Sequence, residues 1–167
     1  GSTSHLYAKA FARTVDIEVE ILQSDSPMNA IRDLLEGRFH AYFDAATTAM
    51  ANARTGRVRL LAVALPERNR ILPDVPTLAE QGVAGLDLPT FTMIAGPARM
   101  EPRRVLLVNE VFVRALSTPT VVDAIAGGAF ETVPSTATQA ATQLRIAYDK
   151  WGEMVQRIGY RKLPVSG

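Results

Sequence analysis

The chain has 167 residues, of which 47% are hydrophobic and 21% are charged. These are ordinary values for a globular protein, and a chain of this length can bury a stable core without disulfides or metals. The net charge of +1 gives no electrostatic reason to expect nucleic acid or an anionic membrane as a partner, and the absence of Cys excludes disulfides and thiolate metal sites.

The first half of the chain alternates predicted helices with predicted strands. Helices are expected over residues 4–13, from Pro27 to about Glu36, and over residues 45–53. For the second of these, Ser26 is the N-cap candidate, Pro27 occupies the first helical position and Gly37 ends the helix. Strands are expected over residues 15–22, 39–43 and 58–64, the last buried on both faces. This order is typical of an α/β layered fold. The second helix is expected to turn four apolar side chains inward: Met28, Ile31, Leu34 and Leu35.

The second half contains a Pro-rich loop over residues 66–76, one or two helical turns over 77–82 and a long extended crossing segment over 86–95. Helices are expected over residues 103–116, from Pro119 to Gly127-Gly128, and after the capping-box pair Thr136 and Gln139, with Gly159 as the stop. A brief strand is expected over residues 130–133. The inward positions of the first of these helices are Val105, Val108, Val111, Phe112 and Leu116, and those of the last are Leu144, Ala147, Trp151, Val155 and Ile158.

The usual signatures of catalysis and metal binding are missing. The only histidines, His5 and His40, have no further ligand at metal-binding spacing, and no phosphate-binding glycine loop or nucleophile elbow occurs. We therefore expect no metal and no cofactor. Asp44, at the end of a predicted strand, is either a catalytic carboxylate or the N-cap of the helix that begins at Ala45.

Three predicted helix N-termini are rich in small hydroxyl residues. In a βαβ layer these termini lie at one edge, the carboxyl ends of the strands, where backbone N–H groups and helix dipoles favour anions such as carboxylates. The alternative is that the residues are only helix caps. The three groups are Ser2-Thr3-Ser4, Ser24-Asp25-Ser26, and Asp44 with Thr47 and Thr48.

Several motifs resemble the substrate-binding receptors of tripartite tricarboxylate transporters, a periplasmic family. The family patterns V-R-x-L-A-V, L-P-D-V-P-T and x-x-E-x-G are matched by residues 58–63, by residues 72–77, and by Glu80 with Gly82. A G-S-x-S-H-L helix start, a D-L-L-x-G helix end and a strand ending in F-D are matched at residues 1–6, 33–37 and 43–44, and a W-G pair at 151–152. The likeness runs in order along nearly the whole chain.

The resemblance implies an α/β, periplasmic-binding-protein type II-like layered fold, with one lobe nearly complete plus the C-terminal part of the other. Residues 1–88 would form the second lobe, and residues 89–167 the crossing segment and C-terminal helices of the first. In the family the stretch like GSTSHL lies mid-chain, so the resemblance implies that an N-terminal part is absent; the alternative is that Gly1-Ser2 is an expression remnant.

The implied function is an extracytoplasmic receptor, not an enzyme, that binds a small di- or tricarboxylate or an amino acid for membrane permease subunits. The expected ligand-binding residues are Ser2, Thr3, Ser4, Ser24, Ser26, Asp44, Thr47 and Thr90. Periplasmic location follows from the family, although the lack of Cys and of a signal peptide fits other compartments too.

Two departures bear on the ligand. Gln23-Ser24-Asp25 stands where the family has a Y-K-G turn, and Phe91 with Met93 stands where it often has W-x-G. An effector-sensing or small enzyme domain, with Asp44 as the catalytic residue, remains the alternative function. The apolar faces of residues 105–116 and of the helix around Trp151 are expected either to pack back on residues 1–88 or to form a homodimer.

Overall fold

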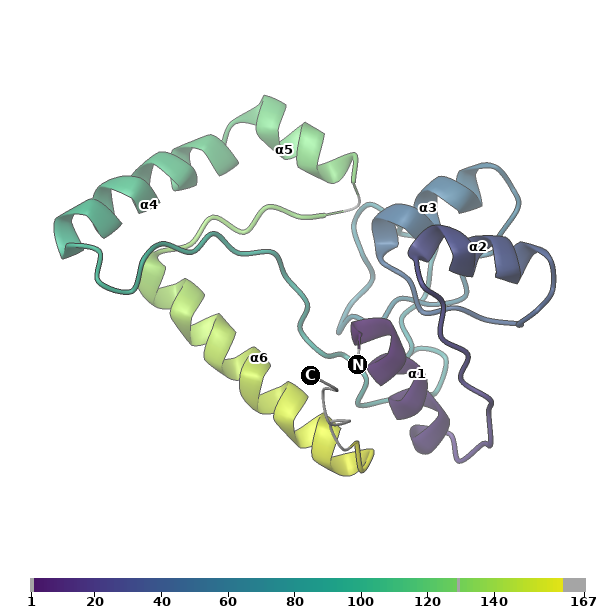
Figure 1. Ribbon diagram of the computed structural model, residues 1–167. Helices are drawn as coiled ribbons and strands as arrows, with labels where there is room; N and C mark the ends of the chain where they lie inside the picture. The colour runs from purple at the N-terminus through teal and green to yellow at the C-terminus, as the bar shows by residue number, and fades with distance from the viewer. Residues whose placement is uncertain (1, 129, 161–167) are drawn as a thin grey trace. The chain divides into compact units, whose positions relative to one another are not determined.

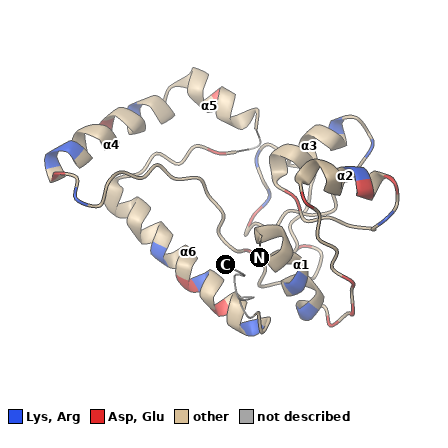
Figure 2. Ribbon diagram, in the orientation of Figure 1, with Lys and Arg blue, Asp and Glu red and all other residues tan. Residues whose placement is uncertain are grey.

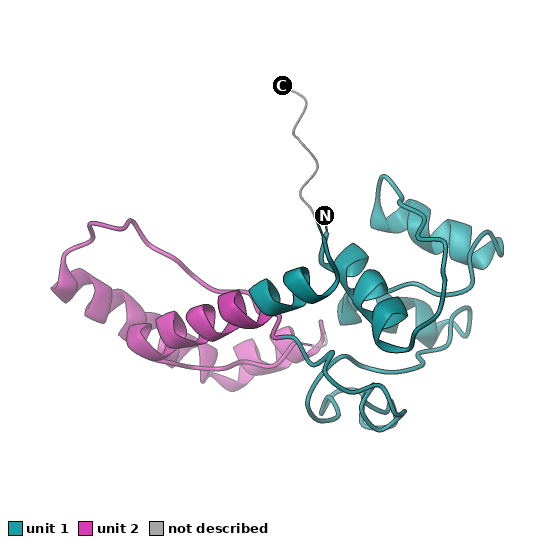
Figure 3. Ribbon diagram, turned by 90° about the horizontal axis from the view of Figure 1, so that it is seen from below, with its two compact units in different colours: residues 1–88, 151–167 teal, residues 89–150 magenta. Residues whose placement is uncertain are grey.

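The computed structural model describes residues 2–128 and 130–160, and all its regular secondary structure within these ranges is helical (Figure 1). The helices are α1 (Thr3–Thr14), α2 (Pro27–Leu35), α3 (Ala46–Arg54), α4 (Pro102–Leu116), α5 (Pro119–Ala126) and α6 (Ala137–Arg157). They belong to two compact units, coloured in Figure 3: unit 1 comprises residues 1–88 and 151–167, and unit 2 comprises residues 89–150. The assignment of residues 1–88 and 89–167 to the two lobes of a receptor stays a prediction.

Helix α1 ends in a C-terminal cap formed by residues 15–17, where the sequence predicts the start of a strand over residues 15–22. Val15 N–H donates to Phe11 O at 3.0 Å, and Ile17 N–H donates to Ala12 O at 3.0 Å. Between them Asp16 has φ 52°, a left-handed conformation that Asp tolerates better than most residues. Val15 and Asp16 therefore cap the helix, and their apolar-polar alternation does not indicate a strand.

Helices α2 and α3 follow the sequence prediction closely. Ser26 caps α2 by accepting from Asn29 N–H at 3.2 Å, and Pro27 occupies the first helical position. Gly37, with φ 72°, ends the helix as predicted. The inward face is wrong at one position, because Met28 is 82% exposed.

The predicted strands over residues 15–22, 39–43, 58–64 and 130–133 are not formed within the described ranges. A strand is stable only when its N–H and C=O groups find a neighbouring strand. The part of the chain that the structure describes contains one isolated parallel bridge, in which Val63 N–H donates to Pro76 O at 2.8 Å and Leu78 N–H to Val63 O at 3.0 Å. The apolar side chains of the first segment are correspondingly half-exposed, Ile17 at 48% and Val19 at 47%.

The L-P-D-V-P-T stretch and the glutamate that follows it form a capped turn. Thr77 N–H donates to Glu80 Oε2 at 2.7 Å, and Glu80 N–H donates to Thr77 Oγ1 at 3.1 Å, the two halves of a capping box. Arg68 Nε lies 3.0 Å from both Glu80 oxygens, and Arg68 Nη1 donates to Pro73 O at 3.0 Å. These hydrogen bonds hold the loop in place beside Val63, so Arg68, Thr77 and Glu80 have a structural role.

The core of unit 1 lies between α1, the segment before residue 89 and the end of α6. Its buried members are Tyr7, Ala10, Leu86, Leu88 and Met154. Trp151 and Ile158 are partly buried against this cluster, so the end of α6 packs on residues 1–88. Gly159, with φ 61°, ends the helix as predicted, and Tyr160 N–H closes the cap on Val155 O at 3.1 Å.

Unit 2 contains no buried residue in α4 or α5. The predicted inward positions Val108, Val111 and Phe112 are 41%, 49% and 39% exposed, so the prediction that they face inward is wrong for the described residues. Figure 2 shows basic residues at the start of α4, before this apolar stretch. Among the described residues no single helix has the length and apolarity to cross a membrane, although α4 and α5, bent by 73°, meet that test as a pair on length and composition alone.

Candidate functional site

The N-terminus of α1 presents backbone donors and hydroxyl groups at one end of unit 1. Ser2 is the N-cap, and its Oγ accepts from His5 N–H at 3.3 Å, while Leu6 N–H donates to Ser2 O at 3.0 Å. The remaining amides of the first turn, those of Thr3 and Ser4, have no acceptor within the helix because the preceding turn does not exist. The helix dipole adds positive potential at the same point.

The second predicted loop lies beside this terminus. Gln23 Nε2 lies 3.3 Å from His5 Nδ1, a hydrogen bond that joins residues 18 apart in the chain. Within the loop, the Ser24 hydroxyl donates to Ser26 O at 3.2 Å. The structure therefore brings Ser2 and Ser24 into one neighbourhood through His5 and Gln23, neither of which is among the predicted site residues. Burial lowers the pKa of His5, with a further contribution from the Lys9 charge, so its neutral form is favoured.

The third predicted loop reaches the same helix end through Tyr42. Its side chain is hydrogen-bonded to Ser4, and its hydroxyl also lies beside the Asp44 carboxylate. Asp44 Oδ1 accepts from Ala45 N–H at 2.8 Å, whereas Oδ2 is buried and meets no partner with good hydrogen-bond geometry among the described residues. We therefore treat the Tyr42 hydroxyl as an electrostatic neighbour of Oδ2. Burial raises the pKa of Asp44, and the hydrogen bond from Ala45 N–H and the neighbouring Tyr42 hydroxyl oppose this rise.

Asp44 is not the N-cap of α3. The cap position is Ala45, which makes no side-chain bond to the helix, and the Asp44 carboxylate accepts from the amide of Ala45 itself. The alternative interpretation of Asp44 as a simple cap is therefore wrong in detail. Nothing in the sequence singles out Tyr42 as its neighbour; only the fold brings Ser4 to them.

The other predicted residues are placed less closely. Thr3 and Thr47 are exposed in the first turns of α1 and α3. Thr90 is exposed too; it belongs to unit 2, whereas the cluster consists of residues of unit 1. Within the described part of the chain no three His, Asp or Glu side chains gather to hold a metal ion.

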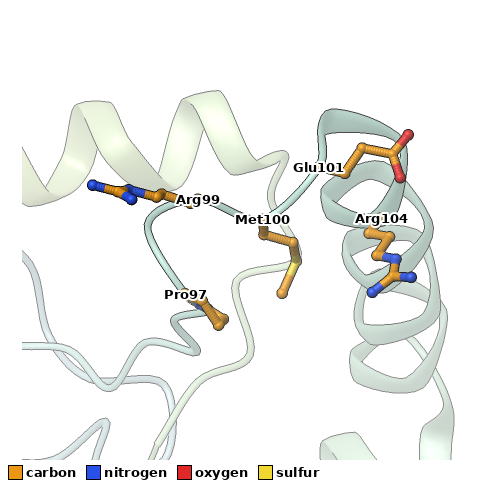
Figure 4. Close-up of a pocket in the computed structure, with 5 residues that line it drawn as sticks. All are labelled: Pro97, Arg99, Met100, Glu101 and Arg104. Carbon is orange, nitrogen blue, oxygen red and sulfur yellow. The ribbon is translucent and has the colours of Figure 1, made fainter.

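A hollow in unit 2 contains none of the predicted site residues. Its lining consists of Pro97, Arg99, Met100, Glu101 and Arg104, at the start of α4. Figure 4 shows that the Arg99 guanidinium and the Glu101 carboxylate extend away from each other. A ligand site needs polar groups that converge, so this hollow is a poor candidate.

Comparison with known proteins assigns a family. Residues 1–160 match the model described as tripartite tricarboxylate transporter family receptor. The chain belongs to this receptor family. A curated relative is protein BugT of Bordetella pertussis, which is 25% identical over 159 residues, covering 95% of this chain and 49% of BugT. The chain thus spans about half the length of this relative.

Solved structures show the fold of the family. Rpa4515 of R. palustris with adipate matches 98% of this chain with a TM-score of 0.86 at 23% identity, and the chain covers 55% of it. The periplasmic binding protein BugD matches 97% with a TM-score of 0.79 at 20% identity, the chain covering 55% of it. MatC of Rhodopseudomonas palustris with bound malate matches 94% with a TM-score of 0.74 at 21% identity, the chain covering 53% of it.

These likenesses confirm the predicted fold class, part of a periplasmic-binding-protein fold. They also decide against the alternative of a small enzyme domain with Asp44 as its catalytic residue, because the family consists of receptors. The cluster around Ser4, Tyr42 and Asp44 is therefore considered below as a binding surface.

Proposed function

We propose that this chain is the part of an extracytoplasmic solute receptor that contributes one wall of a binding site for a small organic di- or tricarboxylate or an amino acid. The observation that carries the proposal is the convergence of two loops on the N-terminus of α1, through His5–Gln23 and through Ser4–Tyr42. Family membership and the fold shared with the adipate and malate complexes support it.

The chemistry of this end of α1 suits a carboxylate. The first-turn amides of Thr3 and Ser4 point out of the helix end, and the positive dipole end favours an anion by a few tenths to about 1 kcal/mol at an exposed terminus. Hydroxyl groups of Ser4 and Ser24 add donors that can turn toward an oxygen. The predicted site therefore captures its ligand by neutral donors and requires no Lys or Arg.

Asp44 tunes this surface. A second carboxylate close to an anionic ligand repels it unless one of the two is protonated. Because burial already raises the pKa of Asp44, the neutral acid is more accessible here than on an exposed surface. We therefore expect binding of a carboxylate to raise the pKa of Asp44 further.

The remaining parts of the proposal concern the whole receptor. BugT and the solved relatives are about twice as long as the segment matched here, and we propose that the corresponding part of the receptor supplies the opposite wall of the cleft. The chain alone is then expected to bind weakly. The receptor would work in the periplasm and deliver its ligand to membrane permease subunits. A homodimer stays a prediction; Trp151 is packed within unit 1, whereas α4 exposes apolar side chains such as Leu106 and Val111.

Thermal unfolding with and without ligand tests the proposal. Adipate, malate and citrate are compared with neutral adipamide at constant ionic strength. A carboxylate at ten times its dissociation constant stabilises the native state by about 1.4 kcal/mol, or about 3–6 °C for a chain of this size. We expect this shift at tens of millimolar carboxylate, its reduction in Ser4→Ala, and its retention in the matched variant Ser117→Ala at the end of α4. A shift that adipamide produces equally would contradict the proposal.

A further inference from the structure

The chain passes between the two units twice, once between Leu88 and Pro89 and once between Lys150 and Trp151. On the unit 1 side, the residue at each crossing, Leu88 at one and Trp151 at the other, contacts the side chain of Tyr7 in α1. The Tyr7 hydroxyl donates to Leu88 O at 2.9 Å. The Tyr7 ring meets the Trp151 ring edge-on, with centroids 5.3 Å apart and planes 83° apart.

These contacts are buried and long-range. Tyr7 is 8% exposed and Leu88 is 6% exposed, and the hydrogen bond joins residues 81 apart in the chain. A buried phenol must keep its hydrogen bond, because an unpaired hydroxyl or carbonyl in the core loses its water without gaining a partner. The two crossings are thus fixed by a side chain that has little freedom to move.

The same ring also reaches the proposed binding surface. Tyr7 stacks on Phe43, with centroids 6.0 Å apart and planes 8° apart, and Phe43 immediately precedes Asp44. In α1, Tyr7 follows Ser4 by one turn, so the two side chains lie on one rigid helix. A displacement of Tyr7 therefore moves with it the helix end that carries Ser4.

We infer that Tyr7 is a positioning residue that holds both crossing segments at one point of unit 1, so that a disturbance at one crossing is transmitted to the other. In a receptor whose two parts close around a ligand, such a point would be the base of the hinge. The inference concerns the chain without ligand, so its test is independent of whether the proposed function holds.

Tyr7→Phe tests the inference because it removes only the hydroxyl that holds Leu88 and keeps the ring that meets Trp151. Trp151 is the single Trp of the chain, so fluorescence quenching by acrylamide reports the second crossing alone. Amide hydrogen exchange of peptides covering residues 86–92 reports the first crossing. The matched control is Tyr148→Phe, in which the same hydroxyl is removed from a side chain that is 73% exposed on α6.

We expect Tyr7→Phe to speed exchange over residues 86–92 about three- to tenfold and also to raise the quenching constant of Trp151. We expect Tyr148→Phe to change neither. Faster exchange at residues 86–92 with unchanged Trp151 quenching would show that the crossings are independent and would overturn the inference. An equal rise in exchange throughout unit 1 would overturn it too, because Tyr7 would then serve only global stability.

A second variant removes the aromatic ring. Tyr7→Leu abolishes the contacts with both crossings, so both readouts should change more than in Tyr7→Phe. If the ring contact alone governs Trp151, Tyr7→Leu changes quenching while Tyr7→Phe does not, and the inference fails.

Discussion

Replacing Leu86 by Ala should destabilise unit 1 more than any change at an exposed leucine. Leu86 is 1% exposed, the largest fully buried side chain among the described residues, and it packs with Tyr7, Ala10, Leu88 and Met154. The substitution removes three carbon atoms from this cluster. At about 0.8 kcal/mol for each buried carbon, the lost burial is about 2.4 kcal/mol, and the residual cavity adds to it.

The cavity contribution should be modest here. The side chains packed around the cluster, such as Phe11, Trp151 and Ile158, are themselves only partly buried and can move inward. We therefore expect a total loss of about 3 kcal/mol, near the lower end of the range for buried leucines. For a chain of this size that loss lowers the unfolding midpoint by about 6–12 °C.

Thermal and urea unfolding followed by Trp151 fluorescence measure this loss in unit 1. Leu61→Ala is the matched control, because Leu61 is 64% exposed and should cost no more than about 0.5 kcal/mol. If the two variants lower the free energy of unfolding equally, the core described around Leu86 does not exist as a cooperative unit.

Three further predictions follow from titration and backbone geometry. Burial raises the pKa of Tyr7 from 10.0 to about 12, so its stabilising contribution is complete below pH 10 and is lost as the pH rises through 12. Burial raises the pKa of Tyr42 as well, so alkaline absorbance titration should show a late-titrating component at about pH 12 that is lost in Tyr7→Phe. The raised pKa of Asp44 has the same sign in the acid range, so the wild-type chain should lose stability relative to Asp44→Asn as the pH rises above 3.8. Urea unfolding measures this, and a difference in the free energy of unfolding between the two chains that stays constant from pH 3 to pH 7 would refute it. Gly37→Ala should cost about 1 kcal/mol because φ is 72° there, whereas Gly152→Ala, inside α6 with nothing within 4 Å, should gain about 0.5–1 kcal/mol; opposite signs in thermal unfolding are the critical result.

The helices could be predicted from the sequence because their signals are local. Ser26 with Pro27 starts α2, Gly37 ends it, and the Thr136–Gln139 capping box precedes α6 with its reciprocal bonds of 2.9 and 3.2 Å. Each signal involves residues within one helical turn of one another. Nothing distant is needed to read them.

Whether the predicted strands form could not be decided from the sequence, because a strand depends on a distant partner strand. Residues 15–22 alternate as a strand should, yet Asp16 caps α1 and Ile17 and Val19 remain half-exposed. Likewise the apolar spacing of α4 predicts the helix correctly but predicts the burial of its apolar side chains wrongly. Helical spacing shows which side chains share a face, and it does not show whether another element covers that face.

For the candidate site, the sequence indicated the loops and not their connections. The α/β pattern predicts Ser2, Ser24 and Asp44 as neighbours at one edge of a sheet, although no such sheet is formed in the described ranges. The contacts that link the loops come from His5, Gln23 and Tyr42, none of which is among the predicted ligand-binding residues. The ligand role of Ser2, Ser24 and Asp44 stays a prediction.

The most direct test of a carboxylate-binding surface is an amide NMR titration of the chain with adipate and malate, which detects millimolar affinities. We predict saturable shifts at Thr3 and Ser4, with smaller ones at residues 24–26 and 44–48, and none with adipamide at equal ionic strength. Saturable shifts confined to unit 2, or identical shifts with the neutral diamide, would contradict the account.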